Sequence, residues 1–177
     1  MTIKREVFIS VDIEASGPIP GEYSLLSIGA CDAYRPENSF SCLVKPTSDN
    51  AVPEALAVTG LSLDKLQLEG EAPPDAMARF ADWVSTCSGS GTPVFVGLNA
   101  GFDWSFINYY FIRYYGSNPF GIAALDIKAL FMGARGCSWK ETKSSNMKQV
   151  TGALTEGTHD ALEDARFQAE LFRRIRG

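Results

Sequence analysis

The chain has 177 residues, of which 45% are hydrophobic, and this predicts one globular domain over residues 1–177 rather than a disordered polypeptide. No apolar run approaches the roughly 18 to 20 residues of a membrane span, so we expect a soluble, cytoplasmic protein that does not associate with membranes. The formal net charge of −5 argues against binding nucleic acid through a general positive field.

The first half of the chain predicts three strands followed by two helices. Runs typical of strands cover residues 7–13, 25–33 and 40–45, and the short turn-rich connections between them favour neighbouring antiparallel strands. A short helix is expected within 53–62. Apolar residues at helical spacing predict a longer helix within 71–87.

The second half alternates strands and helices. A buried strand is expected within 92–101, an apolar-striped helix within 102–116, and a short strand followed by a short helix within 121–136. An amphipathic helix is expected at the C-terminus, within 158–177, and the segment 134–148 should be the least ordered. The order of elements predicts an α/β domain: a mixed β-sheet, three antiparallel strands and then parallel ones, flanked by helices.

The four cysteines, Cys31, Cys42, Cys87 and Cys137, stand far apart and form no CxxC pair. This spacing favours buried free thiols in a reducing compartment over disulfides or a zinc site.

Two carboxylates, Asp12 and Glu14, end the first strand, although acids are poor strand formers. Residues i and i+2 project from the same face of a strand, so the two carboxylates point together and repel each other. A divalent cation such as Mg²⁺ or Mn²⁺ would remove the conflict, because it prefers hard oxygen ligands. A strand end that simply reaches solvent is the alternative.

A third acid, Asp103, lies in "NAGFD", where the strand within 92–101 gives way to a helix. Taken alone, an aspartate at this place is expected to cap the helix or to favour its positive N-terminal end.

The single histidine, His159, precedes Asp164 by five residues in "HDALED". If both residues were helical they would lie about 140° apart, so they could not share a face. Asp160 and Glu163 form an acidic capping-box pattern, which predicts that the helix begins between His159 and Asp164. His159 would then lie on the preceding loop and Asp164 in the first turns of the helix. The two side chains can then converge. For each, an ordinary surface position is the alternative.

Together these motifs resemble the DEDDh family of 3′-to-5′ exonucleases, which have a ribonuclease-H-like fold and include bacterial ribonuclease T and the proofreading subunit of the replicative DNA polymerase. The resemblance is carried by "VDIEASG", "NAGFD" and "HDALEDA" in the family's order, and it covers nearly the whole chain.

The resemblance implies a two-metal-ion phosphodiester hydrolase. Asp12, Glu14, Asp103 and Asp164 would hold two Mg²⁺ or Mn²⁺ ions, and His159 would be the general base that deprotonates the attacking water. The implied partners are single-stranded 3′ ends of DNA or RNA. None of the five expected catalytic positions is missing.

The resemblance also suggests residues that contact the terminal nucleotides. The candidates are Ala15, Ser16, Gly17, Thr59, Gly60, Leu61, Asn99 and Phe102. Many relatives have two threonines after the glutamate, where this chain has Ala15 and Ser16, so any hydroxyl contact at Ala15 is lost. Leu61 is equally well read as a core leucine, and helical spacing favours core packing for Phe106, whereas Phe102 is open.

Two other functional readings compete with a 3′–5′ exonuclease. One is a non-catalytic nucleic-acid-binding or scaffold protein of the same fold, and the other is an endonuclease of the wider ribonuclease-H-like group. A basic segment from Ile127 to Val150 carries five cations and one anion, and it is either a phosphate-contacting patch or a solvated loop. This segment and the apolar stripe within 102–116 are candidate contacts for a homodimer.

Overall fold

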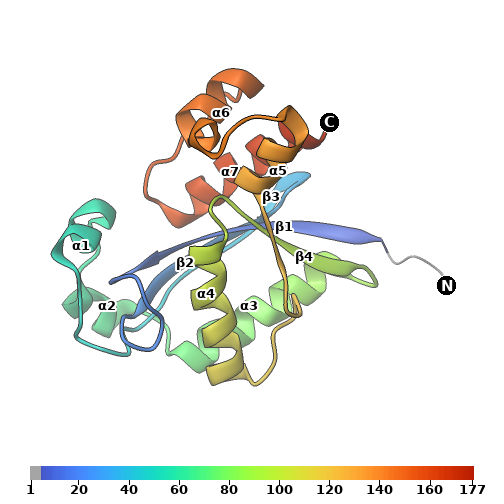
Figure 1. Cartoon of the computed structure of the whole chain (residues 1–177). Coiled ribbons are helices and arrows are strands. Elements are labelled where there is room, and N and C mark those ends of the chain that lie inside the picture. The colour runs from blue at the N-terminus through green and yellow to red at the C-terminus, as the bar shows by residue number, and fades with distance from the viewer. Residues whose placement is uncertain (1–4) are drawn as a thin grey trace.

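The computed structural model describes residues 5–177 and has a five-stranded mixed sheet with the order β3-β2-β1-β4-β5 (Figure 1). The strands are β1 (Glu6–Ala15), β2 (Leu25–Asp32), β3 (Arg35–Leu43), β4 (Thr92–Gly97) and β5 (Ala124–Asp126). The pairs β1–β2 and β2–β3 are antiparallel, whereas β1–β4 and β4–β5 are parallel. The predicted mixed sheet, antiparallel first and parallel afterwards, is confirmed.

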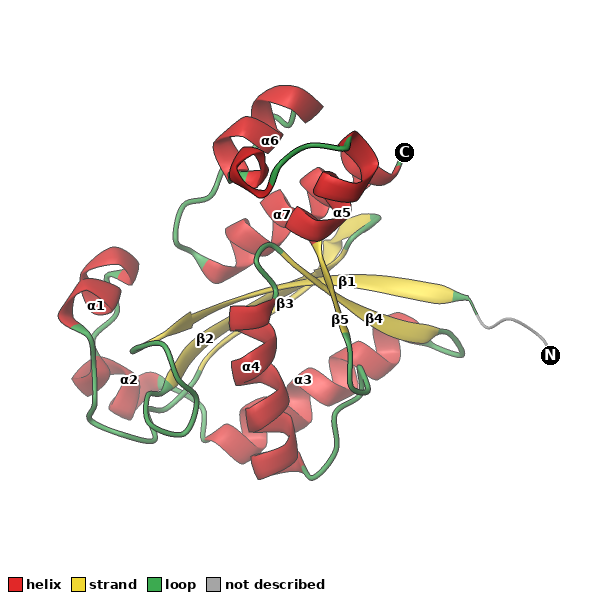
Figure 2. Cartoon of the chain, in the orientation of Figure 1, coloured by secondary structure: helices red, strands yellow, loops and turns green. Residues whose placement is uncertain are grey.

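Helices cover both faces of this sheet (Figure 2). They are α1 (Pro53–Thr59), α2 (Leu63–Glu69), α3 (Pro73–Ser88), α4 (Gly101–Tyr110), α5 (Ile127–Arg135), α6 (Ser144–Thr151) and α7 (Ala161–Arg176), with a π-helical continuation of α4 over Phe111–Tyr115 and a 3₁₀ turn over Trp139–Thr142. Helices α3 and α4 lie on one face, and α5 and α7 lie on the other. Within the described part of the chain, no helix combines the length and the apolar character needed to cross a bilayer.

Alternation along β1 assigns its side chains to two different environments. Val7, Ile9, Val11 and Ile13 pack into the core under α3 and α4. Phe8 belongs to the second core, under α5 and α7. Since side chains alternate, Asp12 and Glu14 project from the same face as Phe8, toward α7. One strand therefore anchors the larger core and presents both acids on its opposite face.

The segment 134–148 contradicts the prediction that it is the least ordered part of the chain. The Ser138 hydroxyl and backbone N–H both donate to the Glu141 carboxylate, at 2.7 and 2.8 Å, and start the 3₁₀ turn. Helix α6 follows directly and buries Met147. The order of this segment depends on local side-chain hydrogen bonds, since Ser138 caps the 3₁₀ turn and the Thr142 hydroxyl donates to Trp139 O at 2.8 Å.

Several predicted boundaries also shift. The third strand starts at Arg35 rather than at residue 40, and the first short helix ends at Thr59, before the C-cap Gly60, whose φ of 67° is left-handed. Helix α2 was not predicted, because its seven residues bury only Leu66 and give no periodic signal. The four cysteines are free thiols, as predicted, but only Cys31 and Cys42 are buried, whereas Cys87 and Cys137 are half-buried.

Close contact between Gly29 of β2 and the start of α7 yields a stability prediction. A Cβ atom on Gly29 would overlap the backbone of Ala161 and Leu162. We expect Gly29→Ala to lower the free energy of unfolding by about 1–3 kcal/mol, because α7 must move away from the sheet. Urea denaturation measures this change.

Gly133→Ala is the matched control. Gly133 is an exposed residue of α5, and a Cβ there would meet nothing within 4 Å. It should raise stability by up to about 1 kcal/mol through helix propensity. Equal effects of the two substitutions would contradict the close packing at Gly29.

Candidate active site

The end of β1 places two acids over the middle of the sheet. Asp12 pairs with Gly29 of β2 and Glu14 pairs with Ser27, and a bulge follows between Glu14 and Ala15. Because Gly29 has no side chain, the first turn of α7 approaches the sheet closely beside Asp12. The acids and the helix therefore enclose one site.

Asp103 reaches this site from the first turn of α4, although α4 covers the other face of the sheet. The Asp103 side chain is buried, and its Oδ1 accepts the backbone N–H of Ile13 at 3.1 Å. Ile13 lies between the two acids of β1, so this bond fixes Asp103 beside them. The pKa of Asp103 is raised to about 7, chiefly by burial and also by repulsion from Glu14 and Asp126, while backbone hydrogen bonds act to lower it.

The predicted start of α7 between His159 and Asp164 is confirmed. The Asp160 carboxylate caps the helix by accepting the N–H groups of Leu162 and Glu163, both at 3.0 Å. His159 is exposed on the preceding loop with a φ of 62°, a left-handed conformation that is uncommon outside glycine. The Glu163 side chain pairs with Arg166 rather than completing the capping box.

Asp164 holds in place the loop that carries His159, residues 152–160 between α6 and α7, which we call the histidine loop. Its two carboxylate oxygens accept the backbone N–H groups of Thr158, at 2.6 Å, and of His159, at 3.2 Å. Farther along α7, Glu170 accepts from the backbone of Leu154 and Thr155, both at 3.0 Å. Burial works to raise the Glu170 pKa, but these hydrogen bonds, one from the Thr155 hydroxyl and one from Arg174 hold the pKa at about 2.

The acids and the histidine converge. Ligand atoms of Glu14, His159 and Asp164 all lie within 4.8 Å of one another. Burial raises the pKa of Asp12 well above its ordinary value, and Asp103, Asp164 and Glu14 raise it further by repulsion. Burial also raises the pKa of Glu14 to about 7, with added repulsion from Asp164 and Asp160.

A hard divalent cation fits this donor set. Carboxylate oxygens are the ligands that Mg²⁺ and Mn²⁺ prefer, and one imidazole lies beside them. Burial and mutual repulsion raise the pKa values of Asp12, Glu14 and Asp103, and a cation bound among them would favour their charged forms. The cluster of three that includes His159 also allows the imidazole to be a ligand instead of a base.

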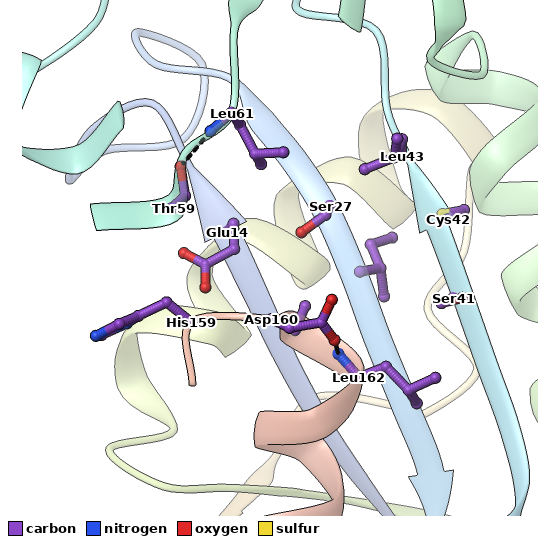
Figure 3. Close-up of a pocket in the computed structure, with 12 residues that line it drawn as sticks. Glu14, Ser27, Ser41, Cys42, Leu43, Thr59, Leu61, His159, Asp160 and Leu162 are labelled. Carbon is purple, nitrogen blue, oxygen red and sulfur yellow. Dashed lines mark hydrogen bonds between the residues drawn. The ribbon is translucent and has the colours of Figure 1, made fainter. Parts of the chain in front are cut away.

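Three cavities meet at the cluster. The first, of about 320 Å³, is lined by Glu14, Thr59, Leu61 and His159, and Figure 3 shows Glu14 between Thr59 and His159. The second, of about 500 Å³, is mainly apolar and lies between Glu14, Ala15, Gly17, Val58 and Phe102. The third, of about 410 Å³, joins Asp12, His159 and Asp164 to Ser144 and Lys148. The site is thus open on several sides to an extended ligand.

The predicted nucleotide-contacting residues divide into two groups. Ala15, Gly17, Thr59, Leu61 and Phe102 line the first or second cavity. The Phe102 side chain is 37% exposed and its ring lies 5.3 Å from that of buried Phe106, so Phe106 packs in the core as expected. Leu61 faces the first cavity and lies outside the two core clusters.

The other predicted nucleotide contacts, Ser16, Gly60 and Asn99, line none of these three cavities. The Ser16 side chain is fully buried, and its hydroxyl donates to Asn50 O at 2.8 Å and accepts the Ser24 N–H at 2.9 Å. Gly60 and Asn99 have left-handed backbones, with φ values of 67° and 63°. The backbone of Ser16 is engaged as well, because its N–H donates to Ser24 O at 2.8 Å and its C=O accepts the Val52 N–H at 2.7 Å, so its position gives no support to a contact with a nucleotide.

In the basic segment, Lys148 lines the third cavity but pairs with Glu156 of the histidine loop at 2.8 Å. Lys128 lies over the ring of Trp139, 4.3 Å from its centroid. Lys148 therefore fits both interpretations of the basic segment. Its ion pair with Glu156 is typical of a solvated loop, and its place in the cavity with Asp12 and Asp164 is typical of a phosphate-contacting patch.

Two residues near the acids were not anticipated from the sequence. Gln168 of α7 contacts Asp12, and Asp126 at the end of β5 accepts the N–H of Ala100 at 2.7 Å. The spacing of Gln168, one helical turn after Asp164, was the available signal.

Comparisons with known proteins agree on one class of enzyme. The RNase_T family model, described as "Exonuclease", matches residues 9–172. The chain is 57% identical over 176 residues to the Escherichia coli protein named 3'-5' DNA exonuclease Cap18, covering 99% of this chain and 94% of that protein.

Two solved structures have the same fold. One is the nuclease domain of 3'hExo, a DEDDh family member bound to rAMP, with a TM-score of 0.77 and 16% identity over 96% of this chain and 90% of that one. The other is E. coli Exonuclease I in complex with a dT13 oligonucleotide, with a TM-score of 0.73 and 18% identity over 96% of this chain and 40% of that one. These likenesses confirm the predicted ribonuclease-H-like fold.

The raised acid pKa values predict an unusual pH dependence of stability for metal-free protein. In the native state the pKa of Glu14 is raised from 4.5, and that of Asp103 from 3.8, to about 7. At pH values between the unfolded and native pKa values, the native state therefore binds more protons than the unfolded chain. The free energy of unfolding should therefore fall as the pH rises from about 4.5 to about 7. Denaturation at several pH values in EDTA measures this slope.

Glu14→Gln should reduce that slope, and saturating Mn²⁺ should remove it in the wild type, because the cation replaces the protons. Glu22→Gln removes an exposed carboxylate and controls for net charge. If Glu14→Gln kept the full wild-type slope in EDTA, the clustered acids would not be its source.

Proposed function

The chain belongs to the ribonuclease T family of exonucleases, the DEDDh class, and from this premise we propose that it removes nucleotides from the 3′ ends of single-stranded DNA by metal-dependent hydrolysis. The family model is described as an exonuclease, and the 57% identical relative is named a 3'-5' DNA exonuclease. The finer parts of the proposal are the metal ions, the histidine base and the choice of DNA.

The convergence of four acids from three distant segments carries this proposal. Strand β1 supplies Asp12 and Glu14, the start of α4 supplies Asp103, and the start of α7 supplies Asp164. These four residues would hold two Mg²⁺ or Mn²⁺ ions. When bound, such ions supply the charge that activates a water molecule and stabilises the leaving 3′ oxygen.

His159 is the proposed general base. Its side chain is exposed at the rim of the site, near Glu14 and Asp164, where it can accept a proton from the attacking water and release it to solvent. Asp164 bonds the backbone N–H of His159, which fixes the direction in which the imidazole leaves the loop. The chain thus holds the base by its backbone and leaves both ring nitrogens available.

The cavities support a terminal nucleotide seated beside Glu14. The apolar cavity with Phe102 and Val58 suits a base, which stacks on aromatic rings with about 1 to 3 kcal/mol per base. Leu61 and Thr59 in the first cavity are placed to contact a neighbouring base. DNA is favoured because the 57% identical relative is named a DNA exonuclease. A homodimer and a cytoplasmic location stay predictions from the sequence.

A labelled oligonucleotide tests the proposal. With 5′-labelled single-stranded DNA and Mg²⁺, the proposed enzyme gives a descending ladder, an endonuclease gives internal cuts, and a non-catalytic binding protein gives no products. Matched RNA and duplex DNA should be degraded more slowly. Faster degradation of RNA would overturn the choice of substrate but not the reaction.

Asp12→Asn should reduce turnover below detection in both Mg²⁺ and Mn²⁺. Asparagine keeps an oxygen that can accept the hydrogen bond from Gln168, so the fold should persist while the metal charge is unmatched. Steady-state rates and circular dichroism check both statements. Asp75→Asn, at an exposed site in α3, is the control, and full activity of Asp12→Asn would remove Asp12 from the metal site.

His159→Asn should lower kcat by a factor on the order of 10² to 10⁴ at saturating metal. Asparagine tolerates the left-handed backbone of residue 159 better than alanine does, so loss of the base is separated from loop strain. Rates measured across Mn²⁺ concentrations distinguish the roles. If saturating Mn²⁺ restored the wild-type kcat, His159 would be a ligand rather than the base.

A further inference from the structure

Gln168 is a buried polar residue that the catalytic assignment leaves unexplained. It lies on α7 one turn after Asp164, and its side chain is 3% exposed. Its Nε2 donates to Oδ1 of Asp12, and its Oε1 accepts the backbone N–H of Leu98 at 2.8 Å. Both ends of one amide are therefore used, each by a segment that carries a proposed ligand.

The chemistry of the partners fixes the orientation of this amide. Exchange of its oxygen and nitrogen would place the amide oxygen against the Asp12 carboxylate and the NH₂ group against the N–H of Leu98. Both contacts would then be repulsive. The Asp12 carboxylate thus accepts a hydrogen bond from a neutral donor whose orientation is fixed. Rotation of the carboxylate would leave the buried Gln168 NH₂ group unpaired, which costs about 1–3 kcal/mol.

Leu98 connects Gln168 to the third acid. It follows β4 in the turn that leads into α4, and Asp103 lies in the first turn of that helix. Asp126 holds the same turn through the N–H of Ala100. Gln168 therefore links α7, β1 and the β4–α4 turn at the point where their acids meet.

We propose that Gln168 is a positioning residue that orients Asp12 for the metal ions and couples its placement to the Leu98 turn. This inference rests on the proposed metal site. The residue itself touches neither substrate nor reacting atoms in this role. Hydrogen-bond partners behind metal ligands typically change metal affinity or activity by about 10- to 100-fold when removed, and this is the size expected here.

Binding of Mn²⁺ in the absence of nucleic acid tests the proposal. Gln168→Met keeps the volume of the side chain and removes both hydrogen bonds, so we expect Mn²⁺ affinity, measured by calorimetry, to fall at least about 10-fold. Amide hydrogen exchange at Leu98 should become faster in the same variant. Gln168→Asn, which is too short to reach both partners, serves if the methionine variant does not fold, and it should also weaken Mn²⁺ binding.

Leu171→Ala is the matched control, because it damages the buried face of α7 without contacting Asp12. It should lower stability and leave Mn²⁺ affinity unchanged. Wild-type affinity in a folded Gln168 variant, or an equal loss in Leu171→Ala, would overturn the positioning role. If the wild type bound no Mn²⁺, both the proposed metal site and this inference would be wrong. If the wild type and Gln168→Met bound Mn²⁺ with equal affinity, only this inference would be wrong.

Discussion

Repulsion among four carboxylates in one partly buried site is the constraint that the rest of the structure serves. Each of three acids is held by neutral donors: Asp12 by the Gln168 amide, Asp103 by the Ile13 N–H and Asp164 by the N–H groups of Thr158 and His159. Among the ion pairs formed within residues 5–177, none includes these acids. Neutral donors fix position without cancelling charge, so the negative potential stays available for cations.

The two faces of β1 explain how the fold sustains such a site. Val7, Ile9 and Val11 point into the larger core, whose burial supplies the stability that a charged cluster costs. The opposite face changes from Phe8 in the smaller core to Asp12 and Glu14 at the strand end. Apolar packing at one end of the strand thus supports charge at the other.

The sequence was sufficient for those parts of the site that depend on local periodicity. The two-residue repeat of a strand predicts that Asp12 and Glu14 share a face, and the cap at Asp160 predicts that His159 and Asp164 converge. Gln168 was not predicted, because a polar residue in an amphipathic helix looks solvated until its tertiary partners are known. For the same reason the burial of the Ser16 hydroxyl and the helical structure within residues 134–148 were not predicted, because both depend on tertiary contacts and caps.

Asp164 is proposed to have two roles at once: it holds the loop that carries His159, and it binds metal. Its oxygens accept two backbone N–H groups of the histidine loop, and it is also a proposed metal ligand. A carboxylate offers about four lone-pair positions, so it can hold the loop and bind a cation together. Its position therefore affects both the proposed metal site and the placement of His159, the proposed base. Because Asp164 and Gln168 lie one turn apart on the same face of α7, the position of this helix over Gly29 affects the proposed base and the proposed metal ligands together.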